Sequence, residues 1–216
     1  MPIQKDSKPA GALSDRAHRQ ITELIQKREL RGGETILEQR LAEKLGISRT
    51  PLREALQRLE GQGMISRSSG RSYLVRRVEM TEYLRSLKVR YLLEPEAAAN
   101  AVGRLDRAAI QAARDEIADL RRLPRVQTDA HWQSDDTVHQ LYGNSDGNDV
   151  MFGIIETLRV TTRLFEIAGL EARVEADFEE HDAILDALEA NDASLARKAV
   201  RTHLRSLMTY SLKLLR

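Results

Sequence analysis

The stretch ILEQRLAEKLGISRTPLREALQRLEGQGMI, residues 36–65, decides the fold of the first part of this 216-residue chain. Leucines recur with helical spacing before Gly46, and glycine favours the left-handed conformation that ends many helices. A second helix begins near Ser48 and carries Pro51 in its first turn, where a missing N–H group costs no helical hydrogen bond. The stretch therefore predicts a short helix, a tight turn and a second helix that runs to about Gln62.

The flanking segments complete a small domain. An amphipathic helix that begins near Ser14 precedes the stretch. After it, MISRSSGRSYLVRRV at residues 64–78 indicates two short strands joined by a Ser/Gly turn with Gly70 at its tip. Three helices followed by a β-hairpin form a winged helix-turn-helix, which we expect over residues 13–78. Residues 1–12 contain Pro, Gly, Lys and Ser without periodicity, and we expect them to form a disordered arm.

The remainder of the chain, residues 79–216, shows helical patterns throughout. Segments such as LPR and NSDGND separate stretches of helical periodicity. Helices joined by short connections form an antiparallel bundle, so the predicted class is mainly α. We expect helices at about 80–102, 106–122, 126–144, 149–169, 171–190 and 192–215.

The two parts differ in charge. Residues 1–78 carry 16 Lys and Arg against 9 Asp and Glu, a net charge of +7, whereas residues 79–216 carry 18 against 24, a net charge of −6. A basic domain suits a polyanion such as DNA, although charge alone is equally consistent with simple solubility. The absence of cysteine excludes disulfides and thiolate metal sites. The chain also lacks an apolar run of about 20 residues and an apolar signal core, so we expect a cytoplasmic protein without a membrane segment.

Arginines cluster where a winged helix-turn-helix meets DNA. Arg49 and Arg53 lie one turn apart at the start of the helix that enters the major groove in this fold. A guanidinium can donate two hydrogen bonds to guanine or clamp a phosphate. Gly70 allows the hairpin tip to approach the DNA backbone, and Arg71 can enter the minor groove. An isolated arginine pair of this spacing usually forms a solvated helix face, but the order of the elements favours DNA binding.

The opening stretch resembles the N-terminal domain of GntR-type bacterial transcription regulators, and its segment SRTPLREAL is highly specific to that family. Some relatives carry arginine at the position of Gln39, so the contact or the operator sequence read there can differ. Paired winged domains read palindromic half-sites, so we expect a homodimer on a double-stranded operator. The resemblance implies DNA contacts from Gln39, Ser48, Arg49, Thr50, Arg53 and Gly70.

Three histidines and an aspartate form a second group. Asp135 and His139 are spaced i, i+4 and project from one face of a helix. His181 and His203 lie about equally far from the turn EAND, so they can face each other across an antiparallel helix pair. His131 lies two turns before His139 and could compete as a ligand. Three imidazoles and a carboxylate suit Zn, Ni, Mn, Co or Fe better than Ca or Mg, and they leave positions open for a ligand. A single histidine is more often a core residue, but the combined spacing favours a divalent transition metal.

Residues 80–216 resemble the FCD ligand-binding domain of the FadR subfamily. The resemblance rests on VRYLLEPEAA at residues 89–98, a D-x-x-x-H motif, a Gly-Asn pair and two later histidines. It implies a small organic acid as effector and a bound metal. The metal ligands implied by the motif are Asp135, His139, His181 and His203.

Arginines near these motifs are candidates for binding the acid. Arg90 can hold a carboxylate with two hydrogen bonds, or it can form an ion pair with Glu94 one turn on. Arg159 and Arg163 form another i, i+4 pair, directed either at the pocket or at solvent. Asn148 belongs to the Gly-Asn pair of the matched pattern. We therefore expect effector contacts from Arg90, Arg159, Arg163 and Asn148.

These features together predict a ligand-responsive, DNA-binding transcription regulator that acts as a repressor. An acid that binds two conformations with different affinities would shift the bundle and change operator binding. One alternative is a regulator for which the metal itself is the signal. Another is a metal-dependent hydrolase joined to a DNA-binding domain. Asp136 and Asp182 are the nearest candidates for a general base, and both fit solvated helix faces, so we expect no enzymatic activity.

Overall fold

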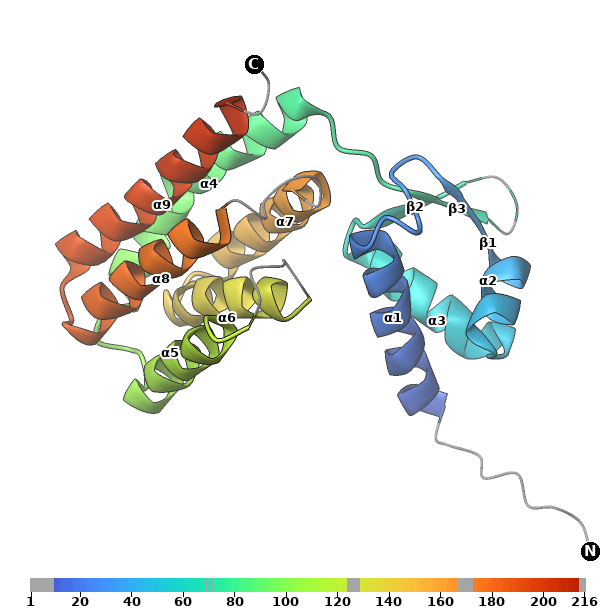
Figure 1. The fold of residues 1–216 in the computed structure, drawn as a ribbon, viewed down its shortest axis with the longest axis horizontal. Helices are drawn as coiled ribbons and strands as arrows, with labels where there is room; N and C mark the ends of the chain where they lie inside the picture. The colour runs from blue at the N-terminus through green and yellow to red at the C-terminus, as the bar shows by residue number, and fades with distance from the viewer. Residues whose placement is uncertain (1–9, 69, 71, 124–128, 167–172, 214–216) are drawn as a thin grey trace, which may run out of the picture. The chain divides into compact units, whose positions relative to one another are not determined.

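The computed structural model describes residues 10–68, 70, 72–123, 129–166 and 173–213 (Figure 1). The chain forms two compact units, and apart from a short segment that begins at Arg163 and groups with the first unit, the boundary between them follows Glu79. The first unit contains helices and a small sheet, and the described part of the second contains only helices and their connections. The predicted class, a winged helix-turn-helix followed by a helical bundle, is confirmed. None of the described helices is long and apolar enough to cross a membrane.

In the first unit, α1 and α3 pack against each other. Ile21 of α1 and Leu52 and Leu56 of α3 are fully buried at this contact. Gly46, with φ 64°, ends α2 in the left-handed conformation and so makes the tight turn before α3. The elements of this unit are α1 (Ala10–Gln26), β1 (Thr35–Leu37), α2 (Glu38–Leu45), α3 (Arg49–Gly61), β2 (Ile65–Arg67) and β3 (Ser72–Val75).

The sheet has three antiparallel strands in the order β1-β3-β2. The sequence analysis predicted β2 and β3 but missed β1, because three residues are too few to show alternation. The predicted disordered arm is wrong for residues 10–12, which form the first turn of α1. Alanines at positions 10 and 12 favour a helix there. The rest of that prediction, residues 1–9, lies outside the described residues.

The second unit is a bundle of helices that closes its first helix against its last. α4 and α9 lie side by side and run in opposite directions, with a hydrogen bond of 2.6 Å between the hydroxyls of Tyr83 and Ser211 (Figure 1). Its helices are α4 (Met80–Ala101), α5 (Arg107–Leu120), α6 (Asp129–Ser145), α7 (Asp149–Glu166), α8 (Val174–Glu189) and α9 (Ala193–Lys213). Where the predicted ends fall on described residues they differ from these by at most two residues, and the predicted ends at 126, 169, 171 and 215 lie outside the described residues.

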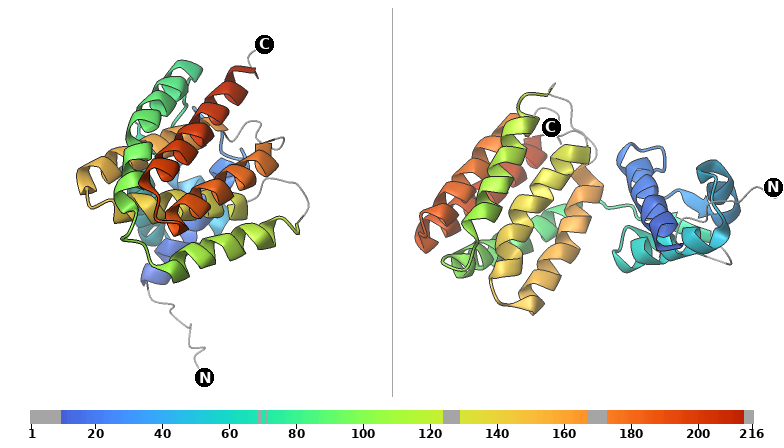
Figure 2. Two further views of the ribbon diagram at one scale, coloured as in Figure 1. Left: turned by 90° about the vertical axis from the view of Figure 1, so that its left-hand side faces the viewer. Right: turned by 90° about the horizontal axis from the view of Figure 1, so that it is seen from below.

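Short connections decide which helices of the bundle meet. The turn at residues 190–192 folds α9 back along α8, and Asn191 occupies it with φ 55°. α6 packs against α4, α5 and α8, and the right-hand view of Figure 2 shows it between α5 and α7. This packing brings α6, α8 and α9 together, although they are distant in sequence.

Candidate metal centre and nucleic-acid interface

The exposed start of α3 carries the polar side chains that the sequence analysis assigned to DNA. Ser48, Arg49 and Thr50 are exposed, whereas Leu52 and Leu56 of the same helix are buried. The first turn of α3 therefore offers two hydroxyls, a guanidinium and free backbone N–H groups on one surface. A helix N-terminus with these groups attracts phosphate.

Two polar contacts join α3 to α2 on this surface. The Arg49 guanidinium donates to Gln39 Oε1 at 3.2 Å. The Arg53 Nε donates to Glu38 Oε2 at 2.8 Å, and Glu38 is buried whereas Arg53 is about half exposed. Arg53 is therefore held in a fixed orientation by a carboxylate while part of its guanidinium stays accessible. The sequence analysis named both arginines and Gln39 but gave Glu38 no role.

A polar hollow of about 310 Å³ lies between α3 and the β2–β3 hairpin. Gly70 at the hairpin tip has φ 67°, which glycine adopts without strain. Arg67 donates to the Tyr73 hydroxyl at 3.2 Å and lies over that ring. The predicted contact Arg71 lies outside the described residues. The hollow is lined by Glu38, Arg53, Gln57, Arg67, Gly70 and Tyr73.

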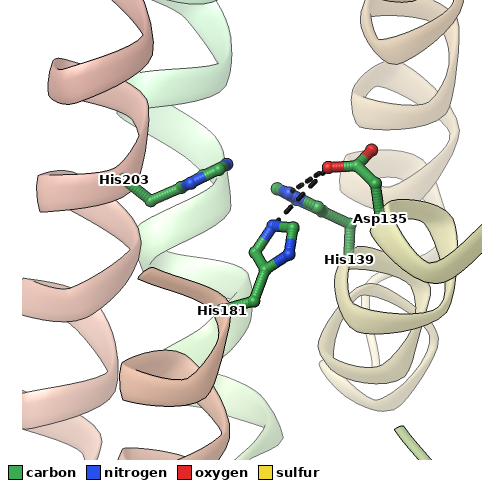
Figure 3. A group of neighbouring side chains, drawn as sticks. All are labelled: Asp135, His139, His181 and His203. Carbon is green, nitrogen blue, oxygen red and sulfur yellow. Dashed lines mark ion pairs between the residues drawn. The ribbon is translucent and has the colours of Figure 1, made fainter. Parts of the chain in front are cut away.

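Four side chains from three helices converge inside the second unit. Asp135 and His139 come from α6, His181 from α8 and His203 from α9 (Figure 3). Each offers one ligand atom, and these four atoms lie within 4.8 Å of one another. The three histidines are at most 3% exposed. The structure thus brings together all four residues that the sequence analysis grouped, including the pair on opposite sides of the α8–α9 turn.

The two nitrogens nearest the aspartate have no hydrogen bond. His139 Nε2 and His181 Nε2 each lie 3.5 Å from Asp135 Oδ1. Both nitrogens are buried, and neither has a hydrogen-bond partner among the described residues. A buried nitrogen without a partner costs about 1–3 kcal/mol, and two such lone pairs at one point are suited to an electrophile such as a metal ion. These donors fit a transition metal, which prefers imidazole nitrogen with carboxylate oxygen.

The charges of the cluster suit metal binding. Burial lowers the pKa of His139 to about 4, of His181 to about 3 and of His203 to about 4. All three imidazoles are therefore neutral near pH 7 and can donate a lone pair. Burial opposes ionisation of Asp135, but the Arg159 guanidinium and the nearby imidazoles hold the pKa of this carboxyl well below its usual range. Asp135 is therefore an anionic donor.

The second ring nitrogen of two histidines meets a glutamate. His139 Nδ1 lies 2.7 Å from Glu94 Oε2, and His203 Nδ1 lies 2.9 Å from Glu180 Oε2. The sequence analysis gave neither glutamate a role at the metal site. Glu180 directly precedes His181 in the sequence, and Glu94 lies one turn from Arg90, but only the packing of helices shows which imidazole each glutamate reaches.

Two of the expected effector arginines are engaged by carboxylates of the protein. Arg90 is buried and forms an ion pair with Glu94, which is the alternative that the sequence left open. Arg159 is also buried and donates to Asp135 Oδ2 and Asp136 Oδ1, both at 2.7 Å. Burial opposes the charge of Arg159, but these carboxylates raise its pKa well above the usual value. Arg159 therefore lies directly beside the cluster.

The other two expected effector residues have no described contact with the cluster. Asn148 is exposed, and its Oδ1 accepts the Met151 N–H at 3.0 Å, so it caps the N-terminus of α7. Arg163 lies near the end of α7 and is half-buried. An effector role for Asn148 or Arg163 stays a prediction.

Comparison with known proteins identifies a family for each of the two units. Residues 13–75 match the gntR family of bacterial regulatory proteins, and residues 85–206 match the FCD domain. The Uxu operon regulator of Haemophilus influenzae is 28% identical over 193 residues, 77% of this chain and 69% of that protein. The putative L-lactate dehydrogenase operon regulatory protein of Escherichia coli is 27% identical over 224 residues, 89% of this chain and 83% of that protein.

A solved structure shows the same fold. The E. coli protein McbR/YncC superposes with a TM-score of 0.71 at 22% identity, over 94% of this chain and 99% of that chain. The FCD match covers more than half of the chain, and the gntR match covers the winged domain. The chain therefore belongs to the gntR family of bacterial regulatory proteins with an FCD domain, and it is a DNA-binding transcription regulator.

Proposed function

We propose that this regulator holds a divalent transition metal in its helical unit and that a small organic acid binding there changes its affinity for operator DNA. One observation carries the proposal. Four buried or half-buried ligand atoms converge within 4.8 Å, and two of them are imidazole nitrogens without a hydrogen-bond partner among the described residues. The ligands would be Asp135, His139, His181 and His203.

The chemistry of these donors limits the choice of metal. Three neutral imidazoles and one carboxylate favour Zn, Ni, Mn, Co or Fe over Ca and Mg. When bound, the metal would supply an electrophilic centre that accepts a carboxylate oxygen. Arg159 donates to Asp135, so its positive charge lies beside the same centre and would favour an anionic effector. Arg90 faces Glu94 instead, which supports an indirect role for that arginine.

The effector class agrees with one relative. A protein 27% identical to this chain is named for an L-lactate dehydrogenase operon, so lactate belongs in the first set of acids to test. We further propose that the regulator is a homodimer on a palindromic operator, because two-fold symmetric winged domains match two-fold symmetric half-sites. Repression released by the acid is the simplest outcome, since a bound dimer can exclude other proteins from its operator.

Thermal unfolding of the whole protein tests the proposal. The melting temperature would be measured in the presence of Zn²⁺ and in the presence of a chelator. Each condition would be combined with a panel of mono-, di- and sugar acids that includes lactate. A ligand that binds only the folded state raises the melting temperature by mass action. We expect Zn²⁺ to stabilise the wild type, and one acid to stabilise the Zn²⁺-loaded form only. His18→Gln, which removes a histidine of the other unit, serves as a control and should keep the wild-type response to Zn²⁺.

Other outcomes would point elsewhere. A melting temperature that does not respond to Zn²⁺, Ni²⁺, Mn²⁺, Co²⁺ or Fe²⁺ would contradict the metal site. A response to metal without a response to any acid, with operator affinity that follows metal concentration, would favour a metal-responsive regulator. Turnover of simple esters or lactones by the loaded protein would favour the hydrolase alternative.

A further inference from the structure

Two series of interacting side chains run outward from the four-ligand cluster, and each series contains an arginine, a glutamate and a histidine. We infer that Arg90 with Glu94, and Arg173 with Glu180, are positioning residues that orient His139 and His203 for metal binding. Both arginines would then serve the metal through a glutamate, and Arg90 would not bind the effector. The inference rests on the proposed metal site and goes beyond its four ligands.

The first series of side chains joins α4 to α6. The Glu94 side chain is completely buried, and its Oε2 lies 2.7 Å from His139 Nδ1. The same oxygen accepts the Tyr142 hydroxyl at 2.6 Å, and the other oxygen forms the ion pair with Arg90. Burial alone would raise the pKa of Glu94, but Arg90 and His139 hold it well below its usual range. The carboxylate is therefore charged and surrounded by donors.

The second series of side chains joins α8 to α9. Glu180 Oε2 lies 2.9 Å from His203 Nδ1 and 2.5 Å from an Arg173 guanidinium nitrogen. Arg173 is 3% exposed, and it also contacts Asp177 Oδ1 and Ser206 Oγ, both at 2.8 Å. The guanidinium is thus fixed on several sides, and it fixes Glu180 in turn.

These contacts decide which nitrogen each histidine presents to the cluster. A carboxylate accepts a hydrogen bond, so the ring proton lies on Nδ1 of His139 and His203, and Nε2 carries the lone pair. A ring flip would break the bond to the glutamate. Carboxylates bonded to the outer nitrogen of a histidine ligand orient the ring and raise its donor strength. A buried carboxylate in turn requires a partner of opposite charge, which each arginine supplies.

The same contacts argue against a second metal site in the second series of side chains. Asp177, Glu180 and His203 also form a group whose ligand atoms lie within 4.8 Å of one another. The Arg173 guanidinium bonds both carboxylates of this group. A cation of the protein therefore already neutralises both carboxylates, and the group serves His203 instead.

Matched pairs of glutamate variants test the inference in the full-length protein. Glu180→Gln is compared with Glu179→Gln, whose side chain is exposed, and Glu94→Gln is compared with Glu96→Gln on the same helix. The measurements are the dissociation constant for Co²⁺ and the visible absorption spectrum of bound Co²⁺. We expect Co²⁺ to bind about 10- to 100-fold more weakly to Glu180→Gln and Glu94→Gln, with an altered spectrum. The two control variants should match the wild type.

The arginines are tested by separating metal binding from acid binding. Arg90→Gln and Arg173→Gln should weaken Co²⁺ binding, and Arg173→Lys should restore part of the loss. At saturating Co²⁺, Arg90→Gln should bind the acid as tightly as the wild type does. Weaker acid binding with unchanged Co²⁺ affinity would overturn the inference for Arg90 and return it to the effector site.

The failures can be told apart. If the wild type binds no Co²⁺, the proposed metal site itself is wrong. If the wild type binds Co²⁺ and folded Glu180→Gln binds it as well as Glu179→Gln does, only the inference is overturned. Glu94 is completely buried, so its variant requires a circular dichroism check of folding. Glu180 is only partly buried, and its variant decides the question if the Glu94 variant does not fold.

Discussion

Each imidazole of the cluster is held neutral by burial, and this makes the metal-free protein sensitive to acid. Burial lowers the pKa of the three histidines to about 4, 3 and 4, from an ordinary value of 6.5. Between pH 6.5 and pH 4 the unfolded chain therefore binds more protons than the folded protein does. The free energy of unfolding is therefore highest above this window and decreases as the pH falls through it. The decrease is roughly 2 kcal/mol per histidine between pH 7 and pH 5.

Urea unfolding in chelator at pH 7 and pH 5 measures this effect. Trp132, the only tryptophan, is buried in α6, so its fluorescence reports the helical unit. His181→Gln removes one titrating group and should make the dependence on pH shallower. Equal free energies of unfolding at pH 7 and pH 5 would contradict the buried, neutral state of the imidazoles.

Arg49 is the residue whose exposure and position best support a DNA contact. Arg49→Ala should weaken operator binding by about 1–3 kcal/mol, the range for a bidentate contact to guanine. Arg58→Ala is the matched control, because Arg58 lies on the same helix but pairs with Asp15 of α1. Fluorescence anisotropy with labelled operator and with variants of each base pair would measure both affinity and specificity.

The pattern of losses separates the two kinds of contact. Loss of a base contact relaxes the sequence preference at one base pair. Loss of a phosphate contact weakens binding to every sequence and reduces the slope of log affinity against log salt concentration by about 1. Equal operator affinities of Arg49→Ala and Arg58→Ala would remove Arg49 from the interface.

Residues that act within one helix or across one turn were predictable, and residues that act between distant helices were not. The i, i+4 spacing of Asp135 and His139 placed both on one face without knowledge of the fold. Glu94 reaches His139 from a helix 45 positions earlier in the sequence, so no local pattern could pair them. The ion pair of Arg90 with Glu94 was one of two alternatives, and only the packing of the helices shows that it forms.

The turn between α8 and α9 sets the distance between His181 and His203, two of the proposed metal ligands. Asn191 has φ 55°, a left-handed conformation that asparagine tolerates better than alanine does. Its Oδ1 also accepts the Gly103 N–H at 3.1 Å. Asn191→Ala should lose about 1–3 kcal/mol of stability, whereas Asn191→Gly keeps the conformation and loses the side-chain hydrogen bonds to Gly103 and Glu189.

Urea unfolding followed by Trp132 fluorescence at pH 7 compares the two variants with the wild type. The order of stability should be wild type, Asn191→Gly and then Asn191→Ala. An alanine variant at least as stable as the glycine variant would show that the left-handed conformation is not what the turn requires.

Elements were predicted where they are long and periodic. The helices of the second unit follow from their apolar patterns and their breaks. The strand β1 was missed because its three residues gain their structure from pairing with β3, which is 35 or more positions later. The start of α1 was placed too late because a composition typical of a disordered arm extends into its first turn.

At the scale of the whole molecule, two binding events should be coupled in both directions. If the acid lowers operator affinity about tenfold, operator DNA must lower acid affinity by the same factor, because the coupling free energy is shared. Anisotropy measures the first effect, and calorimetric titration of the acid into the metal-loaded protein with and without operator measures the second. Unequal factors would show that the acid also acts outside the one-to-one complex, for example on the association of protomers.

The pairing of α4 with α9 has a consequence for how the protein is made. Tyr83 and Ser211, which share a hydrogen bond, are separated by 128 positions. At a synthesis rate of about 5–20 residues per second, Ser211 follows Tyr83 by roughly 6–26 s, so α4 waits for that time before its partner is complete. The DNA-binding unit precedes α4 and can fold during that time. The nascent regulator therefore acquires its DNA-reading unit first, and its helical unit exposes an apolar surface to chaperones until α9 has emerged and packed against α4.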